Sequence, residues 1–396
     1  MKKNTNAKFL FFFFLPALIA GTLFFPYYLL LRQSGERAAA KFIASSLANG
    51  NDCVYSPATA WGTEASSFKP LQYDYLKPKI AIVGSSRSMQ FKNIYFQKES
   101  FTFGGAVKNV NDLSNVVSDL LNIHRPEAVI LQVDYWWFFS KYRVGEKPKN
   151  AHIYTEFIES VMRAYKPYLW LAEGKVTLKK FIDAVTGQQK KELCRYGIRG
   201  LFEDRGYVKD GSYFYGKKYT VHNQEIGFFA EKRSLKNSVY RGDSDKNFID
   251  ESRLNIFAKI LEKLDNEKVE YVIVFPPFAP DLFLHMTKNN QTIVNSFNFV
   301  VERIKGFAGK NVFDFHNPFI IQTNDCEFLD GDHPGQIAVG RMLLGLKDSR
   351  VGHLLKISFI ENDIASNEGR TVSLAELDRY MPKQKEVDFL NIGCNK

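Results

Sequence analysis

Short apolar runs alternate with amphipathic segments along most of this chain. A strand inside a parallel sheet gives such a continuous apolar run, because helices cover both of its faces. Most of the runs end at glycine, proline or aspartate, residues that are typical of turns. The sequence predicts five strands, over residues 80–83, 100–103, 128–133, 269–275 and 311–315.

The segments between these runs carry apolar residues at the spacing of one helix face. One helix follows Asp112, a second extends from Leu254 to Leu264, and a third begins at Gly335. Strands that alternate with helices favour an α/β fold. We therefore expect a flavodoxin-like parallel sheet of about five strands between helices.

The N-terminal segment has a different pattern. Residues 9–31 contain no charged side chain, and a helix needs about 20 apolar residues to cross the hydrocarbon core of a bilayer. Basic residues precede this stretch, which favours a cytoplasmic N-terminus. We expect an N-terminal transmembrane helix that places the rest of the chain on the periplasmic or extracellular side of the cytoplasmic membrane. The alternative is a cleaved signal peptide, with small residues at 38–40 and 44–46 as cleavage sites.

These patterns divide the chain into four regions. We expect a cytoplasmic tail and anchor over residues 1–31, a stalk and linker over 32–78, and the α/β domain over 79–350. The domain would carry a long insertion, about residues 135–248. A C-terminal extension over 351–396 would contain one helix, over residues 372–380.

Composition and charge exclude several classes of protein. The 396 residues are 45% hydrophobic and 24% charged, which is globular rather than disordered. The formal net charge of +10 suggests a polyanionic partner. However, the sequence has no zinc finger, P-loop, helix-turn-helix signature or dense basic stripe, so we expect no binding of nucleic acid.

The four cysteines are Cys53, Cys194, Cys326 and Cys394. They are widely spaced and form no zinc-binding pattern, and the histidines do not have metal-ligand spacing. We therefore expect neither a metal nor another cofactor. In an oxidising compartment two disulfides could form, and the sequence leaves their pairing open.

Candidate chemistry lies directly after the predicted strands, where open parallel sheets bind ligands. Ser86 follows the first strand, and Asp330 and His333 lie together after the last one. A serine hydroxyl becomes a nucleophile when a histidine accepts its proton, and a carboxylate orients that histidine. These residues predict a Ser86–His333–Asp330 site, with Asp332 as the alternative carboxylate.

Further candidates surround this site. Backbone N–H groups of Ser86 and of Gly104 or Gly105 could stabilise an oxyanion. Arg87 could bind an anionic substrate group or pair with Asp134. Asp134 could be protonated, bound to Arg87 or purely structural. Tyr135 and Trp136 could stack on a sugar or pack within the insertion.

The chain resembles the SGNH (GDSL-type) hydrolases. Gly84-Ser85-Ser86-Arg87 is similar to the first block of the family, with Ser85 where Asp is usual, and Asp330-Gly331-Asp332-His333 is similar to the last. By this resemblance Ser86 is the nucleophile, His333 the base, Asp330 its carboxylate and Gly105 or Gly104 the oxyanion glycine. The Asn of the third block is missing, because residues 132–135 read Gln-Val-Asp-Tyr.

More narrowly, the layout resembles membrane-anchored SGNH-like proteins of polysaccharide O-acetylation, including the alginate O-acetyltransferase group. The similar features are the anchor, the Gly-Ser-Ser-Arg and Phe-Gly-Gly turns, the Val-Asp-Tyr strand end, and residues 209–213 and 275–280. The resemblance covers about residues 79–345.

This resemblance implies serine-dependent O-acyl transfer, with acetyl as the expected group, to a cell-envelope or exported polysaccharide. It also implies a multi-pass membrane acyltransferase that supplies the acyl donor. Two alternatives stay open at this point. One is a carbohydrate acetyl esterase of the same fold, and the other is a non-catalytic polysaccharide-binding or assembly factor. The sequence leaves the sugar, the acyl group and the oligomeric state undefined.

Overall fold

A five-stranded parallel sheet forms the centre of the protein. The computed structural model describes residues 5–36, 38–58, 64–140, 166–188, 194–223, 226–237 and 249–395. The strands lie in the order β3-β2-β4-β8-β9, which is the 2-1-3-4-5 order of flavodoxin-like sheets. They are β2 (Ile80–Val83), β3 (Ser100–Thr102), β4 (Ala128–Gln132), β8 (Glu270–Phe275) and β9 (Val312–Asp314).

All five strands lie within the segments predicted from the apolar runs. The order reverses between β2 and β4, where Ile80 pairs with Ala128 and Val83 with Leu131. The chain leaves these two strands in opposite directions across the sheet, which opens a crevice at their carboxyl ends. The first predicted site residues follow β2 at this point.

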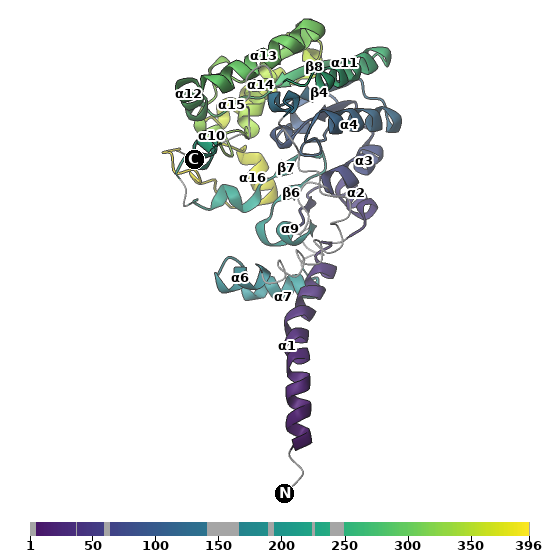
Figure 1. Cartoon of the computed structure of the whole chain (residues 1–396), viewed down its shortest axis with the longest axis vertical. Helices are drawn as coiled ribbons and strands as arrows, with labels where there is room; N and C mark the ends of the chain where they lie inside the picture. Colours follow the sequence, from purple (N-terminus) through teal and green to yellow (C-terminus); the bar gives the residue numbers. More distant parts are fainter. Residues whose placement is uncertain are drawn as a thin grey trace.

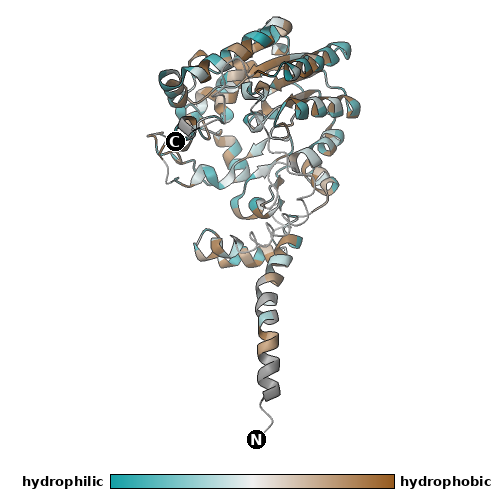
Figure 2. Ribbon diagram, in the orientation of Figure 1, coloured by the Kyte–Doolittle hydropathy of each residue, from teal (hydrophilic) through white to brown (hydrophobic). Residues whose placement is uncertain are grey.

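The side chains of the strands point alternately to the two faces of the sheet. Ala81, Val83 and Leu131 pack on one side with α4 (Val110–Ile123), α11 (Glu251–Asn266) and α13 (Gln291–Ala308). Ile80, Ile82 and Ile130 pack on the other side with α14 (Gln336–Leu344) and α15 (Ile357–Ser366). Figures 1 and 2 show this layered body, in which apolar residues concentrate in the strands.

Three helices fall where the sequence pattern predicts them, and these are α4, α11 and α14. Two others between β8 and β9 were not predicted, namely α12 (Pro280–Asn289) and α13. The signal for α13 is present in the sequence, because its buried side chains recur at helical spacing: Ile293, Val294, Phe297, Val300, Val301 and Ile304.

The region predicted as a stalk and linker, residues 32–78, is largely part of the folded body. It contains α2 (Ala40–Asn49), β1 (Val54–Tyr55) and α3 (Glu64–Leu76), and α2 and α3 pack on each other. Ile43, Val54 and Phe68 lie in the same core cluster as β2 and β4. Packed helices and a strand therefore lie where a stalk and linker were expected, and Pro57 and Pro78 are buried.

The predicted insertion forms a second, smaller sheet with this N-terminal region. Its strands are β5 (Arg195–Tyr196), β6 (Gly206–Tyr207) and β7 (Tyr213–Phe214), and the sheet order is β5-β1-β6-β7. The described helices of the insertion are α6 (Lys166–Ala172), α7 (Leu178–Thr186), α9 (Ile198–Glu203) and α10 (Phe229–Asn237). Residues 141–165, 189–193, 224–225 and 238–248 of the predicted insertion lie outside the described residues.

The predicted anchor lies within the long helix α1 (Thr5–Gln33), which projects from the body in Figure 1. Its C-terminal end packs against α7, where Tyr27, Leu30 and Leu31 meet Phe181 and Ala184. Within the described part of the chain, no helix combines the length and apolar character that crossing a bilayer requires. A membrane anchor over residues 9–31 stays a prediction.

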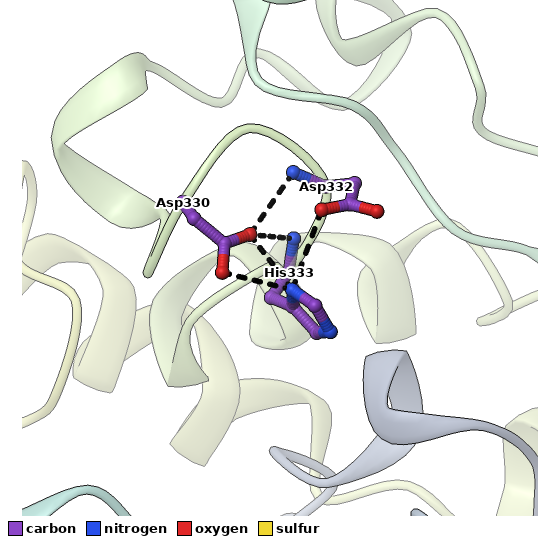
Figure 3. A group of neighbouring side chains, drawn as sticks. All are labelled: Asp330, Asp332 and His333. Atoms are coloured by element: carbon purple, nitrogen blue, oxygen red, sulfur yellow. Dashed lines mark hydrogen bonds and ion pairs between the residues drawn. The ribbon is translucent and has the colours of Figure 1, made fainter. Parts of the chain in front are cut away.

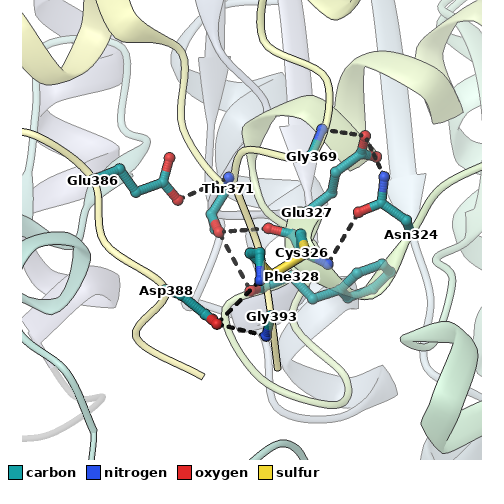
Figure 4. The surroundings of a disulfide bond; sticks show 10 residues. Asn324, Cys326, Glu327, Phe328, Gly369, Thr371, Glu386, Asp388 and Gly393 are labelled. Carbon is teal, nitrogen blue, oxygen red and sulfur yellow. Dashed lines mark hydrogen bonds between the residues drawn. A yellow bond between two sulfur atoms is a disulfide. The ribbon is translucent and has the colours of Figure 1, made fainter. Parts of the chain in front are cut away.

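The cysteines form two disulfides, Cys53–Cys194 and Cys326–Cys394. The first joins the start of β1 to the start of β5 in the small sheet. The second joins the C-terminal tail to the short turn η8 (Asp325–Glu327), as Figure 4 shows. In the C-terminal extension, α16 (Leu374–Tyr380) matches the predicted helix, and α15 was not predicted.

Candidate active site

Ser86, His333 and Asp330 meet at the carboxyl end of the main sheet. Ser86 Oγ lies 2.7 Å from His333 Nε2, and His333 Nδ1 lies 2.7 Å and 2.9 Å from the two oxygens of Asp330. All three side chains are half-buried. This is the hydrogen-bonded arrangement in which an imidazole can take the proton of a serine hydroxyl while a carboxylate holds the other ring nitrogen.

The serine lies in a tight turn, residues 84–89, which we call the serine turn. After β2 ends at Val83, the chain enters a single 3₁₀ turn over Ser86–Ser88. The Ser85 side chain caps this turn by accepting the Arg87 N–H at 3.2 Å. Ser86 N–H has no hydrogen-bond acceptor among the described residues, so it is available to a ligand.

The other two members come from one loop, residues 329–333, which we call the histidine loop. Asp330 Oδ1 accepts the backbone N–H groups of Asp332 and His333 at 3.2 Å and 2.9 Å. Leu329 N–H donates to His333 O at 2.9 Å and closes the loop. Because Asp330 binds both the backbone and the ring of His333, it fixes the loop and the imidazole together (Figure 3).

Asp332 is a second carboxylate against the same imidazole. It is 4% exposed, and its Oδ1 lies 3.4 Å from His333 Nδ1. Burial by itself lowers the pKa of His333, but the negative charges of Asp330 and Asp332 outweigh this effect and raise that pKa to about 10. The imidazole is therefore mostly protonated at neutral pH, and its basic form becomes more abundant as the pH rises.

The same three side chains are also a potential cation site. Ligand atoms of Asp330, Asp332 and His333 lie within 4.8 Å of one another. However, His333 Nδ1 is already hydrogen-bonded to Asp330 and its Nε2 to Ser86. A metal on either nitrogen would replace one of these contacts, so the geometry fits proton transfer better than metal binding.

The turn that contains Gly104 and Gly105, which we call the glycine turn, uses its N–H groups for hydrogen bonds within the protein. Gly105 N–H donates to Ser85 O at 2.9 Å, and Gly104 N–H donates to Thr102 Oγ1 at 3.0 Å. Neither group is free for an oxyanion in this structure. A Cβ at Gly104 would lie 2.8 Å from the Met89 nitrogen, and Gly105 has a φ of +80°, so close packing and backbone conformation explain both glycines.

Arg87 pairs with Asp134, which was one of the predicted alternatives. Its Nη1 lies 3.1 Å from Asp134 Oδ1, and the two side chains are 2% and 1% exposed. The other nitrogens donate to backbone carbonyls of Asp332, Pro276 and Pro277 at 2.7–2.9 Å. The guanidinium therefore holds the serine turn against the histidine loop from a buried position.

Tyr135 and Trp136 are buried at 1% and 7% exposure. The Trp136 ring lies 5.5 Å from the Arg87 guanidinium carbon, and the Phe278 ring lies 4.7 Å from it. Trp136 therefore packs over the buried arginine, while the Tyr135 ring lies 5.7 Å from the rings of Phe297 and His316. Both side chains pack against the main body, whereas the packing alternative placed them within the insertion.

Gln132 lies at the end of β4, where the resemblance leaves the third-block Asn missing. Its Oε1 accepts from Ser85 N–H at 2.7 Å and from Ser85 Oγ at 3.0 Å, while its Nε2 donates to Asp134 at 2.9 Å. Gln132 is fully buried and links the serine turn to the Arg87–Asp134 pair. Its side chain therefore stabilises the serine turn through both polar groups of Ser85.

Two residues of the insertion that were not predicted lie near the histidine loop. A Cβ at Gly331 would lie 3.1 Å from Glu231 Cγ, and burial raises the pKa of Glu231, with the charges of Asp330 and Asp332 adding to this effect. Burial and the charge of Asp330 also raise the pKa of Tyr215. The sequence gives no signal for either contact, because the segments around both residues have no clear periodicity.

Together, the serine turn and the histidine loop bring Ser86, His333 and Asp330 into hydrogen-bonding contact at the switch point of a doubly wound sheet. The glycine turn contacts the serine turn through Gly105 N–H and Ser85 O, and Arg87, paired with Asp134, contacts the histidine loop. In comparisons with known proteins, no family model, curated protein or solved structure matches the chain.

Proposed function

We propose that the protein is an SGNH-like, serine-dependent O-acyltransferase that moves an acyl group, with acetyl as the expected one, to a polysaccharide hydroxyl. The observation that carries this proposal is the contact of Ser86 Oγ with His333 Nε2 at 2.7 Å, with Asp330 on the other ring nitrogen. The resemblance of the motifs, rather than the geometry, supports the polysaccharide as acceptor.

In the first half-reaction, Ser86 Oγ attacks the carbonyl carbon of the acyl donor while its proton moves to His333 Nε2. The carbonyl oxygen becomes an oxyanion, which the free Ser86 N–H can stabilise. When the tetrahedral intermediate collapses, the bond to the leaving group breaks and His333 returns the proton to that group. The product is an acyl ester on Ser86.

In the second half-reaction, a sugar hydroxyl attacks the acyl-enzyme and gives its proton to His333. Collapse of the intermediate breaks the bond to Ser86 Oγ, which recovers a proton from His333. Water in place of the sugar would complete an esterase reaction by the same steps. Both halves need the neutral imidazole, so we expect faster acylation as the pH rises toward the raised pKa of His333.

We further propose that this chemistry takes place outside the cytoplasm, on a chain anchored through residues 9–31. The pairing of all four cysteines supports an oxidising compartment. There the acyl donor has to be supplied across the membrane, for which the resemblance implies a multi-pass acyltransferase partner.

The nucleophile can be tested with a fluorophosphonate probe, which attaches covalently to activated serines. The full-length chain should be labelled, and Ser86→Ala should lose at least about 1,000-fold of both labelling and acetate release from p-nitrophenyl acetate. Ser45→Ala is the matched control, because Ser45 lies on α2 and its hydroxyl, as far as the described residues go, bonds only to Phe42 O. Labelling of the Ser86→Ala variant at the wild-type rate would overturn the proposed nucleophile.

The acceptor can be tested by adding polysaccharide to the same acetate-release assay. A transferase yields acetylated glycan and releases less free acetate when the acceptor is present. Unchanged acetate release without acetylated glycan would favour the esterase. A chain that is neither labelled nor active would favour the non-catalytic alternative.

A further inference from the structure

Lys69 is a buried lysine behind the glycine turn. It lies on α3, is 0% exposed, and donates through Nζ to the backbone oxygens of Thr102, Gly104 and Gly211 at 2.9, 2.6 and 2.8 Å. An ammonium group has three N–H donors, so these three carbonyls satisfy it completely. Burial lowers the pKa of Lys69 and the charge of Asp210 opposes that shift, while the Tyr207 ring lies 4.5 Å from Nζ.

The contact with Gly104 fixes the direction of a neighbouring group. The carbonyl of Gly104 and the N–H of Gly105 belong to one planar trans peptide, in which they point in opposite directions. When Lys69 holds the oxygen on one side, the N–H must point to the other side. There Gly105 N–H donates to Ser85 O at 2.9 Å.

The same relation holds for the Ser85–Ser86 peptide, whose carbonyl accepts the Gly105 N–H. Ser85 O accepts three hydrogen bonds in all, because Ser88 N–H and Ser88 Oγ also donate to it, at 3.1 Å and 2.9 Å. Ser85 O and Ser86 N–H are opposite ends of one peptide plane. The donors on the oxygen therefore determine where Ser86 N–H points, and this is the N–H left without an acceptor among the described residues.

We propose that Lys69 is a positioning residue for the reaction: through two successive peptide planes, it orients the Ser86 N–H that stabilises the oxyanion. Each hydrogen bond in the series also polarises the next peptide, which strengthens the last donor. The proposal rests on the proposed function, because an oxyanion forms only when Ser86 attacks an acyl donor. In this proposal the glycine turn does not donate to the oxyanion; its Gly105 N–H binds Ser85 O, which orients the Ser86 N–H that does.

Another buried lysine provides a matched control. Lys92 is 3% exposed and donates to Ser212 Oγ at 3.1 Å and to Glu376 Oε1 at 2.9 Å. Neither contact holds Gly104 or Ser85. Replacing the pair together, by Lys92→Met with Glu376→Gln, removes a buried ammonium without leaving a buried carboxylate unpaired.

The kinetic test compares Lys69→Met in the full-length chain with this control, using acetate release from p-nitrophenyl acetate. Lys69→Met should lower kcat by about 10- to 100-fold with little change in KM, since the orientation matters mainly in the transition state. Lys69→Gln keeps part of the hydrogen bonding and should lose less. An equal loss of kcat in the control, or no loss in Lys69→Met, would overturn the proposal.

Amide hydrogen exchange tests the geometry without any activity. In the wild-type full-length chain, the Gly105 amide should be protected and the Ser86 amide should exchange rapidly. In Lys69→Met, peptides over residues 84–89 and 100–106 should exchange faster than in the control. Equal exchange of Gly105 and Ser86 in the wild type would refute the positioning role, even if the variants do not fold. Absence of fluorophosphonate labelling in the wild type would instead refute the proposed function.

Discussion

The serine turn and the histidine loop meet at one site but are held by different means. The serine turn depends on side chains from distant elements, with Gln132 from β4 and Lys69 from α3 acting on its backbone directly or through the glycine turn. The histidine loop is closed by contacts close in sequence and follows the Cys326–Cys394 disulfide, while Arg87 and the Ala279 N–H reach it from other elements. Ser86 is thus positioned mainly by buried polar contacts, and His333 by a short loop next to a disulfide.

The surroundings of that disulfide show how the loop is braced. Glu327 is fully buried and accepts hydrogen bonds from Arg341 Nε at 2.9 Å and 3.2 Å and from Arg341 Nη2 at 3.0 Å, as well as from the Gly369 N–H at 3.3 Å. Thr371 Oγ1 donates to Cys326 O at 3.0 Å (Figure 4). The C-terminal extension therefore supports the histidine loop from behind.

The largest effect is expected where the two regions are joined, at Arg87. Arg87→Met leaves the buried Asp134 carboxylate without its charge partner and should cost about 3–5 kcal/mol of unfolding free energy. Urea unfolding of the full-length chain measures this loss. Arg125→Met is the control, because its contact with Glu267 is 3.6 Å and exposed, and it should cost less than about 1 kcal/mol. Equal losses in both variants would show that Arg87 does not join the regions.

A smaller effect should follow from removing one disulfide at a time. Cys326→Ser with Cys394→Ser and Cys53→Ser with Cys194→Ser should each cost about 2–4 kcal/mol of stability. Only the first pair should also lower kcat, by about tenfold, because only that disulfide braces the histidine loop. Thermal unfolding and acetate release separate the two effects. A loss of kcat confined to the second pair would reverse the comparison.

The smallest effect concerns the second carboxylate of the histidine loop. Asp332→Asn removes one of the charges that raise the pKa of His333, so that pKa should fall. The rise of kcat/KM with pH should then shift toward lower pH, and activity at neutral pH should increase. The pH profile of acetate release measures this shift. A profile displaced toward higher pH would contradict the role assigned to Asp332.

The sequence contains enough information to predict the centre of the fold. Apolar runs locate all five strands of the main sheet, and the residues after the first and last strands include Ser86, Asp330 and His333, which the structure brings together. These predictions depend on local patterns and on the edge that parallel strands share. The catalytic roles of the three residues stay predictions.

The supporting contacts could not be predicted in the same way. Whether Gly105 N–H faces a ligand or Ser85 O depends on the orientation of one peptide, which Lys69 holds from 35 residues away. In residues 32–78, where a stalk and linker were expected, α2 and α3 pack on each other and join the core cluster of β2 and β4. Such contacts leave no periodic signal in the sequence.

The separation of the reacting groups along the chain has a consequence for biogenesis. Ser86 and His333 are 247 residues apart, and the Gly211 carbonyl that completes the Lys69 site comes from the segment between them. A nascent chain that ends before residue 333 carries Ser86 without the histidine that contacts it. Under the proposed function, acylation would become available only after residue 333 has been synthesised, so shorter chains would not consume acyl donor.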